Sequence, residues 1–135
     1  MNRTILSETD LYNFPYINIG LSDGDWVKVK AKAIIDTGAA YCLVHPELIK
    51  ELKLKAFRNA TYIHPQIGAQ PTGYYKVNMF FDLESDTPVC ISEVVCGEIL
   101  VLDFPAEAII GVNFLKYCAF RYDGPNCKFE IDLKF

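Results

Sequence analysis

Apolar and polar residues alternate most clearly in two segments, one near the start of the chain and one at its end. In residues 26–35, valine and alanine alternate with three lysines, and a period of two is typical of a β-strand with one solvated face. Residues 14–21 are also rich in β-forming side chains, and the Ser-Asp-Gly-Asp sequence at 22–25 has the composition of a turn. Residues 14–35 are therefore expected to form a β-hairpin.

The second alternating segment closes the chain. In residues 128–135 an apolar side chain occupies every second position. The β-prone residues 119–122 precede this segment, and the turn-forming sequence Asp-Gly-Pro-Asn at 123–126 separates the two. This pattern predicts a second β-hairpin at the C-terminal end.

Between the two hairpins the pattern indicates a helix and a flap. A short helix is expected from Pro46 to about Leu52, because proline suits the first position of a helix and apolar residues recur at helical spacing. Residues 60–63 and 74–83 are β-prone, and a loop containing glycine and proline spans 64–73. A strand, a loop and a returning strand are the parts of a flap.

Further strands are expected at residues 89–95 and 98–102, on either side of Gly97. Many short strands with one or two short helices indicate an all-β fold, built as a closed or folded β-unit. A chain of 135 residues has the size of one ordinary domain. We therefore expect a single domain over residues 1–135.

Charge and hydropathy exclude some classes of partner. The net charge is −4 and no extended basic cluster occurs, so the composition does not favour a nucleic-acid binder. No apolar run approaches the ~18 residues of a membrane helix, so no membrane partner is expected. The first residues lack the apolar core of a secretion signal, and five cysteines without a Cys-x-x-Cys pair fit reduced thiols. A cytoplasmic location is therefore expected.

The most informative sequence is an acidic residue that follows an apolar run. Ala-Ile-Ile at 33–35 leads into Asp36-Thr37-Gly38, where a strand would deliver a carboxylate into a tight turn. Taken alone, this tripeptide fits equally well a turn in which the aspartate only ends a strand. A second motif, Ile-Ile-Gly-Val-Asn-Phe-Leu, follows at residues 109–115.

Together the two motifs resemble those of the retropepsin-like aspartic proteases. That family pairs an apolar-apolar-Asp-Thr-Gly-Ala segment with a downstream apolar-apolar-Gly-x-Asp/Asn-x-Leu segment. Residues 34–39 and 109–115 match these segments in the same order. The resemblance extends over residues 14–135 and implies a retropepsin-like closed β-barrel of the acid-protease type.

The resemblance also implies roles for individual residues. Asp36 would be the catalytic acid, the loop around it would be formed by three neighbours, and a second segment would pack beneath that loop and support the fold. The flap would reach the substrate with three residues at its tip. These positions are Thr37, Gly38 and Ala39 in the loop, Ile109, Ile110, Gly111 and Asn113 beneath it, and Ile67, Gly68 and Ala69 in the flap.

The chemistry needs two carboxylates, and the chain carries one such motif. Two close carboxylates that share a proton can both activate a water and protonate the leaving group. The other Asp-Thr pair, at Asp86, lacks the glycine, so the second acid is expected from another copy of the chain. A two-fold homodimer would place Asp36 against Asp36, and the terminal strand could join an intersubunit sheet. The expected substrate is a peptide or protein, with no metal or other cofactor.

Three other interpretations remain open at this stage. The same fold could be a non-catalytic module that binds a peptide or protein by strand addition. A cysteine hydrolase could pair Cys42 or Cys118 with His64, although no local signature supports it. The Cys-x-x-His spacing of Cys42 and His45 weakly suggests zinc, but a second pair of ligands is missing.

Overall fold

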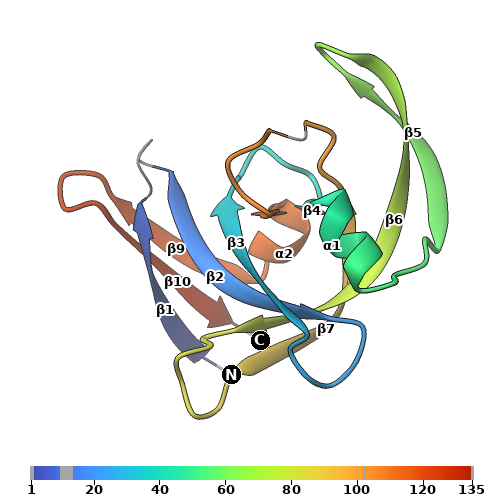
Figure 1. Cartoon of the computed structure of the whole chain (residues 1–135). Helices are drawn as coiled ribbons and strands as arrows, with labels where there is room; N and C mark the ends of the chain where they lie inside the picture. Colours follow the sequence, from blue (N-terminus) through green and yellow to red (C-terminus); the bar gives the residue numbers. More distant parts are fainter. Residues whose placement is uncertain (1, 10–13, 102, 135) are drawn as a thin grey trace.

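The protein is built almost entirely of β-strands (Figure 1). The computed structural model describes residues 2–9, 14–101 and 103–134, so that Leu102 and Phe135, which belong to expected strands, lie outside the described residues. The strands are β1 (Asn2–Thr9), β2 (Pro15–Ser22), β3 (Val29–Ile35), β4 (Cys42–Val44), β5 (Arg58–His64), β6 (Gly68–Phe81), β7 (Val89–Glu98), β8 (Ala108–Ile110), β9 (Cys118–Asp123) and β10 (Lys128–Lys134). The helices are α1 (Pro46–Glu51) and α2 (Val112–Leu115).

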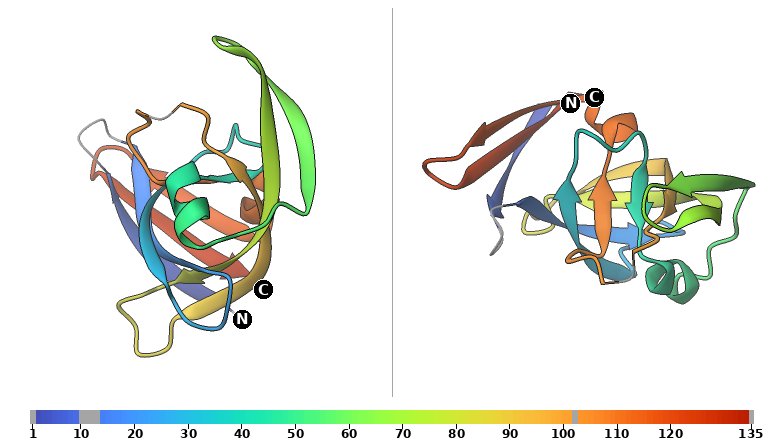
Figure 2. Two further views of the ribbon diagram at one scale, coloured as in Figure 1. Left: turned by 45° about the vertical axis from the view of Figure 1, so that its right-hand side comes forward. Right: turned by 90° about the horizontal axis from the view of Figure 1, so that it is seen from above.

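Six of the strands form a closed barrel, which confirms the all-β class and the closed β-barrel expected from the sequence. Their order is β6-β7-β4-β8-β3-β2, and the pairing of β2 with β6 closes the ring (Figure 2). Apolar side chains from these strands fill the interior, because alternate residues of each strand point inward. Side chains with no exposed surface include Ile19, Ala33, Val44, Met79, Cys96 and Ile110.

The first predicted hairpin is confirmed as β2 and β3, with a longer connection than expected. The register pairs Tyr16 with Ile34 and Leu21 with Val29. Residues 26–28 belong to the connecting loop, where Trp26 is 82% exposed. The Lys28 N–H donates to the Leu21 carbonyl and closes that loop. The alternation of apolar residues and lysines therefore begins in the loop, before the first residue of β3.

The C-terminal hairpin is confirmed as β9 and β10, and it forms a sheet with β1 at the side of the barrel (Figure 2). Phe129, Ile131 and Leu133 are buried against the core, as their alternation predicts. The expectation that the terminal strand could join an intersubunit sheet stays a prediction; within the chain, β1 and β9 pair with the two edges of β10. Among the described strands, the open edge of this sheet belongs to β9.

The flap is the hairpin of β5 and β6, and its strands are longer than expected. Residues 64–73 were expected to be a loop, but β6 runs from Gly68 through Pro71 and Gly73 into the barrel. The N–H of Gly73 points away from β5, toward Glu98. Since alternate residues of a strand point the same way, the nitrogen of Pro71 also faces away from β5, and the missing N–H costs no bond to that strand.

The remaining elements adjust the predicted boundaries. Helix α1 agrees with the prediction to within one residue, and the His45 side chain accepts a hydrogen bond from the Glu47 N–H at its start. The strand expected at residues 89–95 is β7, which continues through Gly97 to Glu98, whereas the separate strand expected at 98–102 is wrong because residues 99–101 are not in a strand. Strands β1, β4 and β8 and helix α2 were not predicted as elements from the sequence. Within the described ranges, neither helix has the length or the apolar composition to cross a membrane.

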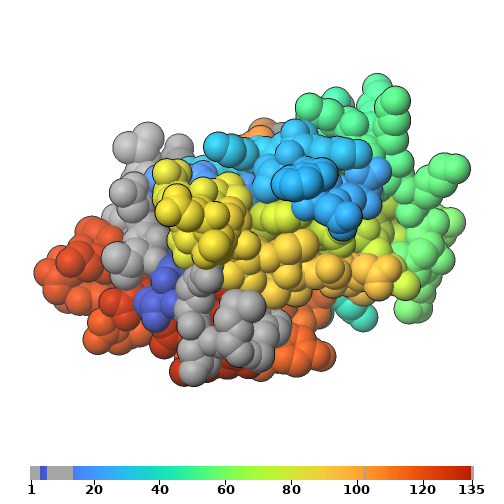
Figure 3. Space-filling model, turned by 90° about the horizontal axis from the view of Figure 1, so that it is seen from below, coloured from blue at the N-terminus to red at the C-terminus, as the bar shows by residue number. Residues whose placement is uncertain are grey.

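The two ends of the barrel differ. Seen from below, residues 23–28 and the connection between β6 and β7 cover the lower end side by side (Figure 3). The Asn78 amide donates to the Gly24 carbonyl across this end. Strand β3 begins at this covered end and runs toward the other, where it delivers Asp36.

Candidate active site

Asp36 directly follows β3 and is positioned by backbone hydrogen bonds. Strand β3 runs parallel to β8, with Ile35 beside Ile110, and the Asp36 N–H donates to the Ile110 carbonyl at 3.0 Å. The Gly38 N–H donates to Oδ1 of Asp36 at 2.8 Å, which orients the carboxylate. Asp36, Thr37 and Gly38 are all exposed. The carboxylate is thus held in place while it remains open to solvent.

The segment after β8 lies against the Asp36 loop at very close range. The Val112 N–H donates to the Ala39 carbonyl at 2.7 Å, and the Asn113 N–H donates to the Ala40 carbonyl at 3.2 Å. A Cβ atom at Gly111 would lie 2.4 Å from the Tyr41 carbonyl oxygen, which is closer than atoms can approach. Only glycine therefore lets these two segments meet.

The side chain of Asn113 bridges two strands of the barrel directly after the Asp36 loop. Its Oδ1 accepts from the Cys42 N–H at 2.8 Å, and its Nδ2 donates to the Val95 carbonyl at 2.8 Å. Both side-chain groups are therefore used to connect β4 with β7. Ile109 and Ile110 pair with β3 and β4, and the backbone N–H groups of the residues that follow Gly111 donate to the segment after Asp36.

The flap tip differs in detail from the expectation. His64 pairs with Gly68 across a three-residue turn at 65–67, and Gly68 has φ of +79°, a conformation that favours glycine. Nδ1 of His64 accepts from the N–H groups of Gln66 and Ile67 and stabilises the turn. Ile67 therefore lies in the turn at the tip, and Gly68 and Ala69 after it are the first two residues of β6.

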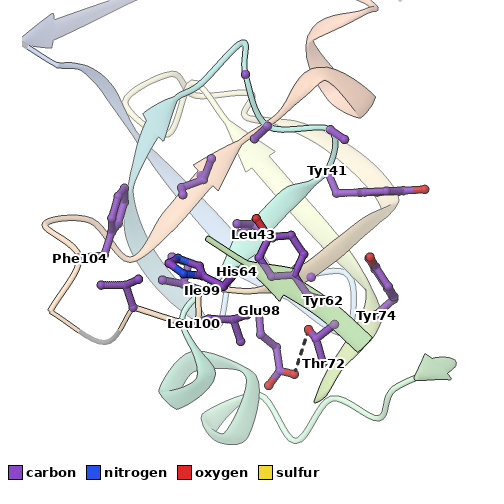
Figure 4. Close-up of a pocket in the computed structure, with 16 residues that line it drawn as sticks. Tyr41, Leu43, Tyr62, His64, Thr72, Tyr74, Glu98, Ile99, Leu100 and Phe104 are labelled. Atoms are coloured by element: carbon purple, nitrogen blue, oxygen red, sulfur yellow. Dashed lines mark hydrogen bonds between the residues drawn. The ribbon is translucent and has the colours of Figure 1, made fainter. Parts of the chain in front are cut away.

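A cavity of about 410 Å³ separates the flap from the Asp36 loop (Figure 4). Gly38, Ala39 and Ala40 form its boundary on the side of Asp36, and the segment after β7 encloses it on another side. None of the three expected flap residues lines it. The flap side chains that do so are Tyr62, His64, Thr72 and Tyr74.

Sequence reasoning did not assign these four residues to the cavity, and it considered His64 only as a partner of a cysteine, although a signal was present. Tyr62 and His64 are two apart on β5, and Thr72 and Tyr74 are two apart on β6, so each pair shares one face of the flap. The two tyrosine rings of Tyr41 and Tyr74 lie 5.3 Å apart and form an aromatic side of the cavity.

Glu98 is the acidic side chain of this cavity, and sequence reasoning did not single it out. Its Oε2 accepts from the Gly73 N–H at 2.8 Å and lies 3.5 Å from the Thr72 hydroxyl. Burial, and then the negative charge of Glu98, raise the pKa of Tyr75 above its usual range. Through its hydrogen bond with Gly73, Glu98 at the end of β7 is connected to the base of the flap.

The cysteines and histidines do not form a second site. Cys42 is fully buried, and its sulfur accepts from the Gly111 N–H. Burial, and then the charge of Cys42, raise the pKa of Cys118 to about 11, so its thiol stays protonated near neutral pH. Among the described residues, no hydrogen bond joins a cysteine to His45 or His64, and no three potential metal ligands cluster.

Comparison with known proteins now identifies the architecture. No protein-family model and no curated protein matches the chain. The crystal structure of a retropepsin-like aspartic protease from Rickettsia conorii superposes with a TM-score of 0.67, over 98% of this chain and 93% of that one, at 17% sequence identity. The chain has a retropepsin-like fold.

At 17% identity the similarity concerns the retropepsin-like architecture. The chemistry of the site therefore depends on the residues of this chain. Those residues are an exposed carboxylate on a firmly supported loop, a flap and a largely apolar cavity between the two.

Proposed function

We propose that this protein is an aspartic endopeptidase in which two copies of the chain each contribute Asp36. The observation that carries the proposal is the exposed Asp36 carboxylate, oriented by the Gly38 N–H and supported from beneath by Gly111. Each chain has one Asp-Thr-Gly sequence, which is half of a two-carboxylate site. The retropepsin-like fold agrees with this chemistry.

The reaction would be peptide hydrolysis by a water held between the two Asp36 carboxyl groups. The first carboxyl group, which is ionised, takes a proton from the water while the water oxygen attacks the peptide carbonyl carbon. The second carboxyl group, which is protonated, donates its proton to the carbonyl oxygen. A tetrahedral diol results. When the C–N bond breaks, the first carboxyl gives its proton to the leaving nitrogen while one hydroxyl of the diol returns a proton to the second carboxylate, so that the products are a carboxylic acid and an amine and both carboxyl groups regain their starting states.

The substrate would be an extended peptide segment between the Asp36 loop and the flap. The flap offers an edge strand, β5, and the cavity beside Gly38 has room for a large side chain. Backbone pairing can provide affinity for an extended segment, while a side-chain cavity provides selectivity. Both features lie on the side of the barrel that carries Asp36.

The exposure of Asp36 and Thr37 on one surface supports assembly with a second copy. A two-fold axis beside this loop would bring the two carboxylates together and would bury both threonines. Strand β9 adds an open edge, on which Phe120 is 42% exposed, and this edge could extend the sheet between two copies. The dimer is part of the proposal because the site is incomplete without it.

The test is Asp36→Asn, measured as peptide cleavage across a concentration series with light scattering in parallel. The substitution is expected to lower kcat by about a thousandfold or more, because it removes the acid–base pair, and to leave the fold intact. Asp86→Asn is the matched control, since it changes the other Asp-Thr pair in an exposed turn. Excess Asp36→Asn chains should also inhibit wild-type chains by forming mixed dimers.

Two results would contradict the proposal. Full specific activity in a strictly monomeric sample would exclude the shared site, and undiminished turnover by Asp36→Asn would exclude this residue. Peptide binding without cleavage by the wild-type protein would instead favour the non-catalytic binding module.

A further inference from the structure

We propose that Glu98 makes the site selective for peptides with a lysine or arginine side chain, which would enter the cavity between the flap and the Asp36 loop. This inference rests on the proposed function, because it names the substrate class of that same site. It is carried by the position of one carboxylate in an otherwise largely apolar cavity.

One oxygen of Glu98 is used within the protein and the other is available. Oε2 accepts from the Gly73 N–H and lies near the Thr72 hydroxyl, so the carboxylate is fixed at the base of the flap. Figure 4 shows Glu98 and Thr72 together on one side of the cavity, with Phe104 on another side. Within the described residues, Oε1 has no hydrogen-bond donor and no lysine or arginine lies within 4 Å of the carboxylate.

The rest of the cavity fits the stem of a long side chain. Leu43, Ile99 and Leu100 provide aliphatic contacts, and Tyr41 and Tyr74 provide aromatic ones. The methylene groups of lysine and arginine pack on such surfaces while their charged end remains at a polar group. Aromatic rings also attract cations that approach their faces. The cavity therefore suits a side chain with an apolar stem and a cationic end.

The negative charge of Glu98 determines which substrate side chains the cavity should prefer. A peptide and the flap above it would exclude water from Glu98, and burial of an unpaired charge is unfavourable. A cation restores the lost interaction through a charge-assisted hydrogen bond, whereas a neutral side chain of the same length does not. An acidic side chain would add repulsion. Lysine and arginine should therefore be preferred over norleucine, and norleucine over glutamate.

The experiment uses peptides that are identical except at one position, which carries lysine, arginine, norleucine or glutamate and is moved along the residues that flank the cleaved bond. At one position, wild-type kcat/KM for lysine or arginine should exceed that for norleucine by about tenfold or more. Glu98→Gln should abolish most of this difference. It keeps an oxygen that can accept from Gly73, and it removes the charge.

Glu84→Gln is the matched control, because it removes the same charge at an exposed position in the connection between β6 and β7. It should preserve the preference. Equal kcat/KM for lysine and norleucine at every position, or a preference that survives Glu98→Gln, would overturn the inference while leaving the protease itself intact.

A binding measurement separates this inference from the proposed function. The Asp36→Asn chain is titrated into the same peptides, labelled for fluorescence anisotropy. If the wild-type protein cleaves none of them but Asp36→Asn binds the lysine peptide at least about tenfold more tightly than the norleucine peptide, the protease proposal fails and the selectivity of Glu98 stands. If no peptide is bound or cleaved, both proposals are wrong.

Discussion

The Asp36 loop and the flap border the same cavity, but the contacts that hold the loop differ from those that hold the tip of the flap. The loop is bonded to a distant part of the chain, through Asp36 to Ile110 and through Ala39 to Val112. The flap tip is bonded to itself, through His64 and through the Gln70 side chain, which donates to the Ile67 carbonyl. The position of the carboxylate is thus set by the core, whereas the tip could move without breaking a bond of the barrel.

Glu98 lies at the boundary between these two regions. Its bonds to Thr72 and Gly73 hold β6 at the point where the flap leaves the barrel. Beyond that point toward the tip, β5 pairs with β6 and with no other described strand. Changes in the Asp36 loop should therefore affect the stability of the whole domain, and changes at the tip should remain local.

The largest effect on stability is expected from Gly111→Ala. The added methyl group would overlap the carbonyl oxygens of Tyr41 and Ala39, which are backbone atoms that cannot turn aside. The free energy of unfolding should fall by about 3 kcal/mol, as for severe overpacking. Urea unfolding followed by fluorescence would measure it. Gly124→Ala is the control, because its nearest contact would be 3.4 Å away in an exposed hairpin turn.

A smaller loss is expected from Asn113→Ala. The substitution leaves the Cys42 N–H and the Val95 carbonyl without their partner, and two such groups cost about 2 kcal/mol together. The control Asn126→Ala removes a bond to Asp123 in an exposed turn and should cost about 0.5 kcal/mol or less. Equal losses for the two variants would show that the Asn113 side chain does not stabilise the connection between β4 and β7.

The sequence predicts the Asp36 loop better than the flap, because the loop carries recognisable local motifs. The loop depends on short motifs around Asp36 and Gly111, and the resemblance of both motifs to those of the retropepsin-like proteases implied that the two would pack together. The C-terminal hairpin was predicted because Phe129 and Ile131 alternate with polar residues, and the first hairpin was predicted from the same kind of alternation in residues 26–35. Such patterns report which face of a strand is buried.

The features that were missed depend on long-range pairing or on position in the fold. Pro71 and Gly73 favour a loop locally, but the pairing with β5 and the bond to Glu98 place them in a strand. Glu98 itself follows Gly97 in an unremarkable sequence, and the antiparallel pairing of β7 with β6 brings it to the base of the flap. Strand β1 had no recognised alternation, and its pairing with β10 provides its place.

The smallest effect is expected at the flap tip, from Gly68→Ala. Gly68 has φ of +79° and open space around its Cα, so alanine would meet backbone strain but no clash. The strain costs about 1 kcal/mol. Because the tip is bonded only to itself, amide hydrogen exchange should quicken at Tyr62 and Gln70, which form the next pair along the hairpin whose N–H groups face across it, while the amides of β3 and β8 keep their protection. Gly68→Asn should perturb exchange less, since asparagine tolerates this conformation. Faster exchange at Asp36 or Val112 in the alanine variant would contradict the separation of loop and flap, because strain at the tip would then be reaching the bonds that position the carboxylate.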